Sequence, residues 1–183
     1  MIVATLTASA QNVAGGFSIK PMAGVSFATI TNDKDAKMKV GFVGGAEAEY
    51  GISNRFGIAA GVVYSMQGAK WSGDDIVIKN NENYLNIPVL AKFYIVEGLA
   101  IQAGVQPGFL LSESLSYNGT KEDPKYYISD TKKFDLSIPM GLTWEIANVV
   151  LDARYNLGVT NMTKSEKFKN SVITVTLGYR FRL

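Results

Sequence analysis

Apolar and polar residues alternate with a period of two along most of this chain. The longest example is the segment from Ser171 to Leu183, in which the odd positions from Ile173 onward are all apolar and the even positions include Arg180 and Arg182. A period of two places the apolar residues on one face of a β-strand. Ordinary globular strands have about five or six residues. A longer alternating strand is typical of a transmembrane β-barrel, where lipid-facing and lumen-facing residues alternate.

The same alternation recurs in seven further segments, so the sequence predicts eight strands. With the last segment they cover residues 17–27, 40–50, 56–66, 85–95, 99–111, 134–144, 149–159 and 171–183. Eight is an even number and the smallest size of a single-chain outer-membrane barrel.

The predicted connections alternate between short and long. Residues 51–54, 96–98 and 146–148 form tight turns, whereas residues 28–39, 67–83, 112–133 and 160–170 form longer polar loops. This arrangement is typical of outer-membrane barrels, which have short periplasmic turns and long external loops. In the second loop, Trp71 and the alternating Ile76 and Ile78 indicate that a hairpin extends above the membrane.

Alternation alone does not say which face of the barrel points inward. The polar face is rich in glycine, which suits a narrow, crowded interior, and the bulky apolar face carries aromatic residues at both of its ends. One expected aromatic girdle, beside the short turns, consists of Tyr50, Phe56, Trp144, Tyr179 and Phe181, and the other of Phe27, Phe42, Tyr64, Phe109 and Phe134. The favoured fold is therefore an all-β, eight-stranded antiparallel up-and-down transmembrane β-barrel. The alternative is a soluble lipocalin-like ligand-binding barrel with the apolar face inside.

Four prolines fall inside predicted strands, at positions 21, 88, 107 and 139. A closed barrel has no free edge that could accommodate a missing N–H group, so these prolines predict bulges or local kinks.

Length and composition limit the possible functions. A chain of 183 residues is expected to form one domain. The chain has no cysteine and no histidine, which excludes disulfides, Cys/His metal sites and the usual nucleophile pairs. The net charge is only +2, without a basic run that would indicate nucleic-acid binding. We therefore predict no catalytic residues, no cofactor and no metal site.

The first residues resemble the end of a secretory signal. A short apolar stretch leads to Ala8-Ser9-Ala10, an A-x-A cleavage pattern before Gln11. The basic region that normally opens a signal is missing, and an Ala-rich frayed terminus is the alternative. The expected division is a signal remnant over 1–12 and one barrel domain over 13–183, exported to the outer membrane.

Charged residues on the polar face are nearly balanced in sign, and charges inside a narrow barrel must be paired. The predicted lumen network consists of Lys20, Glu47, Glu49, Arg55, Lys92, Glu145, Asp152, Arg154, Arg180 and Arg182, with Asp135 placed in the other half of the lumen. Arg180 and Arg182 are expected to face Asp152. Such a network would plug the lumen; the alternative is a selectivity or proton-conducting constriction, since rings of charge tune pores.

The longest loop offers a candidate partner-binding surface. It mixes charges with Tyr117, Tyr126 and Tyr127, and exposed tyrosines on a long loop can anchor a partner. The alternative is a solvated loop whose tyrosines rest on the membrane interface.

Four segments resemble the porin-family outer-membrane β-barrel proteins of the small OmpA/OmpX-like type. They are VYSMQGAK (63–70), NYLNIPVLAKFY (83–94), IQAGVQPGFLL (101–111) and LDARYNLGVTN (151–161). The resemblance implies an eight-stranded outer-membrane barrel of Gram-negative bacteria without catalytic residues. The expected function is that of a non-enzymatic barrel with a plugged lumen in the outer-membrane bilayer, whose external loops contact an extracellular protein or surface ligand. A narrow channel or small-ligand transport barrel is the alternative.

Overall fold

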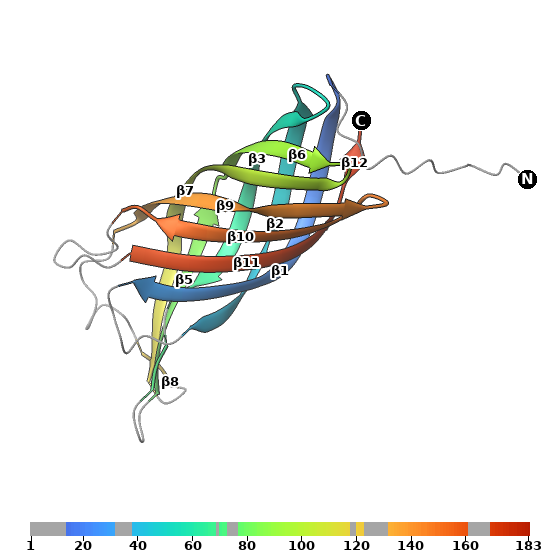
Figure 1. The fold of residues 1–183 in the computed structure, drawn as a ribbon. Coiled ribbons are helices and arrows are strands. Elements are labelled where there is room, and N and C mark those ends of the chain that lie inside the picture. The colour runs from blue at the N-terminus through green and yellow to red at the C-terminus, as the bar shows by residue number, and fades with distance from the viewer. Residues whose placement is uncertain are drawn as a thin grey trace, which may run out of the picture.

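The computed structural model is a β-barrel and describes residues 14–31, 38–68, 70–72, 77–117, 120–122, 132–160 and 169–183 (Figure 1). Its strands are β1 (Phe17–Thr31), β2 (Lys39–Gly51), β3 (Phe56–Gln67), β4 (Lys70–Ser72), β5 (Val77–Asn86), β6 (Val89–Val96), β7 (Leu99–Tyr117), β8 (Thr120–Glu122), β9 (Phe134–Ile146), β10 (Val149–Gly158), β11 (Lys169–Tyr179) and β12 (Phe181–Arg182). None of the described residues belongs to a helix long and apolar enough to cross a membrane.

The strands close into an antiparallel barrel. Strand β1 pairs with β2 on one side and with β11 and β12 on the other, and each remaining wall strand pairs with its neighbours. Strands β5 and β6 follow one another along a single position in the wall. Strands β11 and β12 do the same at another position. The described wall therefore has eight positions, as the alternation predicts, and its antiparallel up-and-down topology is confirmed.

The four prolines interrupt hydrogen-bond ladders without shifting the register. Pro88 separates β5 from β6, yet both strands keep one register against β3, from Tyr64↔Leu85 to Phe56↔Phe93. Pro21 lies opposite the break between β11 and β12, where the pairs on both sides again share one register. Pro107 and Pro139 each coincide with a similar gap in one ladder. A missing N–H group removes a ladder bond but does not move the strand.

The bulges lie elsewhere, so the prolines do not mark bulges; a local kink at these positions stays a prediction. The register of β7 against β5 shifts by one residue between Asn83 and Tyr84, which leaves Leu111 as the extra residue. The register of β6 against β7 shifts between Tyr94 and Val96, beside a short turn. Both irregularities lie near an end of the barrel, where bulges are common.

The two faces of the wall have the polarity of a membrane barrel. Apolar side chains point outward and are exposed, for example Val62 at 53% and Leu142 at 52%. Inward-pointing Glu47 and Lys92 are 2% and 1% exposed. A water-soluble barrel would bury its apolar face, so this polarity contradicts the soluble lipocalin-like alternative.

The barrel has a short-turn end and a long-loop end. At the short-turn end, Ala147 and Asn148 join β9 to β10 with positive φ angles of 48° and 71°, as a tight hairpin turn requires. At the opposite end, β5 and β7 project beyond the other strands (Figure 1). There β4 pairs with β5 and β8 pairs with β7, so part of the predicted loops 67–83 and 112–133 is sheet. The predicted hairpin extension at Trp71 and Ile78 is confirmed.

Candidate functional site

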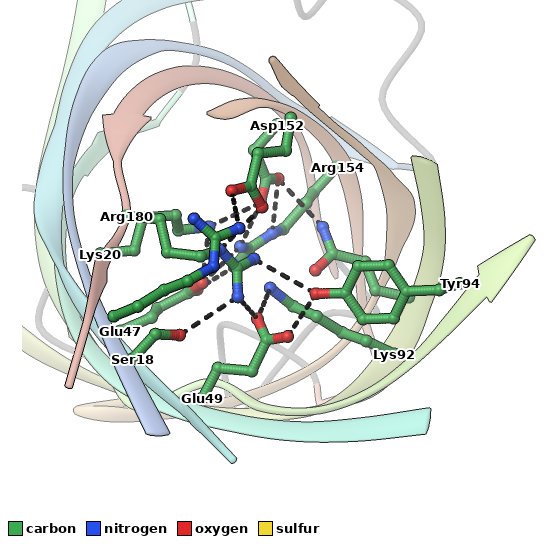
Figure 2. A network of polar contacts seen from close by, with 12 residues as sticks. Ser18, Lys20, Glu47, Glu49, Lys92, Tyr94, Asp152, Arg154 and Arg180 are labelled. Carbon is green, nitrogen blue, oxygen red and sulfur yellow. Dashed lines mark hydrogen bonds and ion pairs between the residues drawn. The ribbon is translucent and has the colours of Figure 1, made fainter. Parts of the chain in front are cut away.

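Arg154 is at the centre of a buried group of four charges in the short-turn half of the lumen (Figure 2). Its Nη1 and Nη2 atoms bind the two oxygens of Glu47, with Nη2 2.9 Å from Oε2. Its Nε lies 2.8 Å from Oδ1 of Asp152, and its Nη2 lies 2.6 Å from Oδ2. Lys20 Nζ bridges the same two carboxylates, 2.9 Å from Glu47 and 3.0 Å from Asp152. Two cations and two anions thus neutralise one another.

A second group of charges surrounds Glu49 and Glu145. Glu49 Oε2 lies 2.8 Å from Lys92 Nζ and 3.0 Å from Arg180 Nη1. The guanidinium of Arg180 also pairs with Glu145, at 2.9 Å, and Arg182 binds the same carboxylate from the rim. Arg182 is 33% exposed, whereas the other four side chains are at least nine-tenths buried.

We call these nine charged residues the ion network. They are Lys20, Glu47, Glu49, Lys92, Glu145, Asp152, Arg154, Arg180 and Arg182. Every one of them forms an ion pair, which offsets the large cost of removing charges from water.

Strand alternation and register bring the ion network together. Lys92, Gln102, Gly141 and Arg154 occupy one continuous row of paired residues across β6, β7, β9 and β10. On β3, Gly61 leaves space for the network: a Cβ atom there would lie 2.6 Å from Cγ of Glu47 and 2.5 Å from the carbonyl oxygen of Ala46. The absence of a side chain at Gly61 on β3 therefore leaves space for the long side chain of Glu47 on the neighbouring strand β2.

Two details of the predicted network are wrong. Arg55 is exposed, in the turn between β2 and β3, and forms no ion pair with the described residues. The turn ends the inward alternation before β3 begins at Phe56. Arg180 and Arg182 contact Glu49 and Glu145 and not Asp152, because the β10–β11 register places Asp152 opposite Thr176, four residues earlier.

Three uncharged residues of the site were not singled out by the sequence. Gln102 Nε2 donates to Asp152 Oδ1 at 3.0 Å, and the hydroxyl of Tyr94 donates to Glu49. Arg180 donates to Ser18 Oγ and to Tyr94 Oη, both at 3.2 Å. All three residues occupy inward-pointing positions of the apolar/polar alternation, so the alternation was the available signal in the sequence.

A less polar layer lies above the ion network toward the long-loop end. Met22, Val43 and Val63 form a buried apolar cluster inside the barrel. Beside it is a cavity of about 20 Å³, lined also by Asn156 and Arg154. A cavity of this size holds about one or two water molecules.

The predicted aromatic residues of the short-turn girdle lie on the outer face. Tyr50, Phe56, Trp144, Tyr179 and Phe181 are 37–54% exposed. The rings of Tyr179 and Phe181 are 4.7 Å apart between centroids. Of the three candidate partner-binding tyrosines, Tyr117 is the last residue of β7, and Tyr126 and Tyr127 lie outside the described residues, as does the expected signal remnant.

The comparisons identify the family of this barrel. Residues 9–164 match the outer membrane protein beta-barrel domain. The chain belongs to this family. It is thus an outer-membrane β-barrel protein, and we refer to the short-turn end as periplasmic and to the long-loop end as external. No curated protein matches the chain significantly.

Solved structures of outer-membrane proteins share the fold. The attachment invasion locus protein Ail of Yersinia pestis is 21% identical, with a TM-score of 0.57, over 92% of this chain and 100% of Ail. Neisserial surface protein A is 16% identical, with a TM-score of 0.55, over 90% of this chain and 97% of that protein. Ail was also solved in complex with the heparin analogue sucrose octasulfate, and that structure is 20% identical, with a TM-score of 0.51, over 91% of this chain and 99% of that one.

Proposed function

We propose that this protein is a non-enzymatic outer-membrane barrel with a closed lumen, which acts through its external strands and loops. The observation that carries the proposal is the ion network, because its side chains reach the lumen from six of the eight wall positions in the described structure, and Gln102 joins it from a seventh. Interdigitating charges that satisfy one another leave no lining for a water-filled channel.

The absence of histidine and cysteine from the whole sequence supports the non-enzymatic part of the proposal. The buried carboxylates do not suit acid–base catalysis either. Glu47, Glu49 and Asp152 each bind at least two cationic side chains, so they are held as structural anions and are shielded from solvent.

Electrical recording in planar bilayers tests the closed lumen. The refolded wild-type barrel should give no stable single-channel conductance, and neither should Glu97→Gln, which changes an exposed periplasmic-turn residue. Arg154→Ala removes the central guanidinium and should produce intermittent openings if folding is retained. A steady conductance of the wild-type protein would instead favour the narrow-channel alternative.

The external end is the surface proposed for contact with a partner. Twelve lysines and ten acidic residues lie in segments 28–39, 67–83, 112–133 and 160–170, and all four arginines lie elsewhere in the chain. The sheet of β4, β5, β7 and β8 carries two of these segments beyond the wall. A sulfated sugar bound to Ail suggests a polyanionic surface as the first probe.

Binding of proteoliposomes to immobilised heparin tests this surface. We expect retention that weakens as salt rises, since lysine contacts to a polyanion are screened. Replacing the exposed Lys132 and Lys133 by glutamine removes two positive charges from the external end, leaves every pair of β7 and β8 in place and should reduce retention. If neither wild-type nor variant proteoliposomes are retained at low salt, the external surface does not recognise polyanions.

A further inference from the structure

Strand β5 places three polar side chains in the external half of the lumen. Asn80, Glu82 and Tyr84 alternate inward and are 5%, 1% and 1% exposed. Asn80 and Glu82 fall in the predicted loop 67–83, and neither belongs to the ion network. Glu82 stands opposite Gln67 of β3 and Glu113 of β7 in the sheet register.

These residues continue into a chain of polar contacts that crosses the lumen. Asn80 Nδ2 donates to Glu82 Oε1 at 2.8 Å. The hydroxyl of Tyr84 interacts with both Glu82 and Asn170. Asn170 Nδ2 donates to Asp135 Oδ2 at 3.2 Å.

On the far wall, Thr160 completes the chain by donating its hydroxyl to Asp135 Oδ1. We call these six residues the external polar layer: Asn80, Glu82, Tyr84, Asp135, Thr160 and Asn170.

The external polar layer contains no cationic residue, and its donors do not satisfy all of its acceptors. Among the described residues, neither Glu82 nor Asp135 forms an ion pair, in contrast to every carboxylate of the ion network. Three buried acceptor oxygens have no hydrogen-bond donor: Oε2 of Glu82, Oδ1 of Asn80 and Oδ1 of Asn170. Glu82 is also repelled by the carboxylates of Asp135 and Glu113. Buried anions and acceptors in this condition are costly unless a positive group satisfies them.

We propose that the external polar layer binds a hard divalent cation, with Ca²⁺ as the reference ion. Its potential ligands are carboxylate, amide and hydroxyl oxygens, and such all-oxygen sets suit Ca²⁺ and not the softer transition metals. The described residues contain no group of three or more acidic side chains arranged for a metal ion. The ligands that we propose are the carboxylates of Glu82 and Asp135 and the amide oxygens of Asn80 and Asn170.

The charge distribution along the lumen gives this site a direction. The ion network contains five cations and four anions, so it carries a net charge of +1 below the negative external polar layer. A cation that enters from outside meets attraction first and repulsion beyond the cavity. Cation binding in the external polar layer does not require the closed lumen to conduct.

Terbium luminescence tests the proposal directly. Tb³⁺ substitutes for Ca²⁺ at oxygen sites, and a nearby tyrosine such as Tyr84 transfers excitation energy to it. Detergent-folded wild-type protein should give saturable Tb³⁺ emission on tyrosine excitation, and added Ca²⁺ should abolish the emission. Glu82→Gln and Asp135→Asn should each weaken binding about tenfold, as expected for loss of a charged ligand. Glu97→Gln, at the opposite end, should bind like the wild type.

Folding of each variant is checked by the heat-dependent mobility shift on electrophoresis. As a second measurement, Ca²⁺ should raise the thermal unfolding midpoint of the wild type and raise that of Glu82→Gln less. Tb³⁺ binding that is unchanged in folded Glu82→Gln and Asp135→Asn would overturn the proposal. So would a folded wild type that shows no saturable cation binding, because the acids of the external polar layer would then be accommodated without an ion.

Discussion

Arg154 on β10 binds both carboxylate oxygens of Glu47 on β2, across the lumen and 107 residues away in sequence. The pair joins opposite parts of the wall, and Asp152 and Lys20 bind the same two groups. The stability of the closed barrel should therefore depend on a few buried charges.

Glu47→Gln should destabilise the folded barrel by about 3 kcal/mol, because removing one partner leaves a buried cation undercompensated. Urea unfolding in detergent micelles or liposomes measures the change. The double variant Glu47→Leu/Arg154→Met should lose less than the sum of its single variants. Strict additivity would mean that the two side chains do not act as a pair.

Gly61→Ala should destabilise the barrel by about 1–3 kcal/mol through overpacking. The new Cβ would meet the carbonyl oxygen of Ala46 at 2.5 Å and Cγ of Glu47 at 2.6 Å. Gly44→Ala is the matched control on β2, because its Cβ would meet mainly the ring end of Phe42, which can move. The two variants are compared by unfolding midpoint, and equal effects would argue against steric control of Glu47 by Gly61.

Leu142→Arg should cost about 2–4 kcal/mol, as expected for a cation in the lipid-facing band of a barrel wall. Leu142 is 52% exposed on the outer face. Val96 is similarly exposed, at 59%, but it lies beside the periplasmic turn. Val96→Arg should therefore cost only about 0–1 kcal/mol. Refolding into liposomes at graded urea concentrations measures both values. A harmless Leu142→Arg would contradict the lipid-facing assignment.

Tyr94→Phe should destabilise the protein by about 1–2 kcal/mol, because Glu49 loses a donor and Arg180 loses an acceptor in a buried site. Tyr155→Phe is the control, since its hydroxyl accepts only an exposed bond from Ser171 at 3.1 Å. Chemical denaturation of both variants under one set of conditions checks the difference. If Tyr155→Phe destabilised the protein as much as Tyr94→Phe, the buried hydroxyl of Tyr94 would contribute no more than an exposed one.

The alternation predicted the barrel because each face of a strand contacts a single environment, lipid or lumen, along its whole length. The outward positions of Leu142 and Val62 and the inward positions of Glu47 and Lys92 followed from parity alone. Parity did not apply at Arg55, because the turn before Phe56 ends the alternation. It also missed Glu82, because the polar sequence around β5 resembles a loop and becomes a strand only by pairing with β3 and β7.

The sequence by itself determined the fold, the lipid-facing side and most of the charges inside the barrel, since these depend on a local repeat of two residues. Only the tertiary structure decided which charges meet. Register links Lys92, Gln102 and Arg154 in one row and places Arg180 beside Glu49 and Glu145. It also leaves the acids of the external polar layer without ion pairs among the described residues. Partners across a closed barrel are set by strand stagger and curvature, which no local pattern encodes.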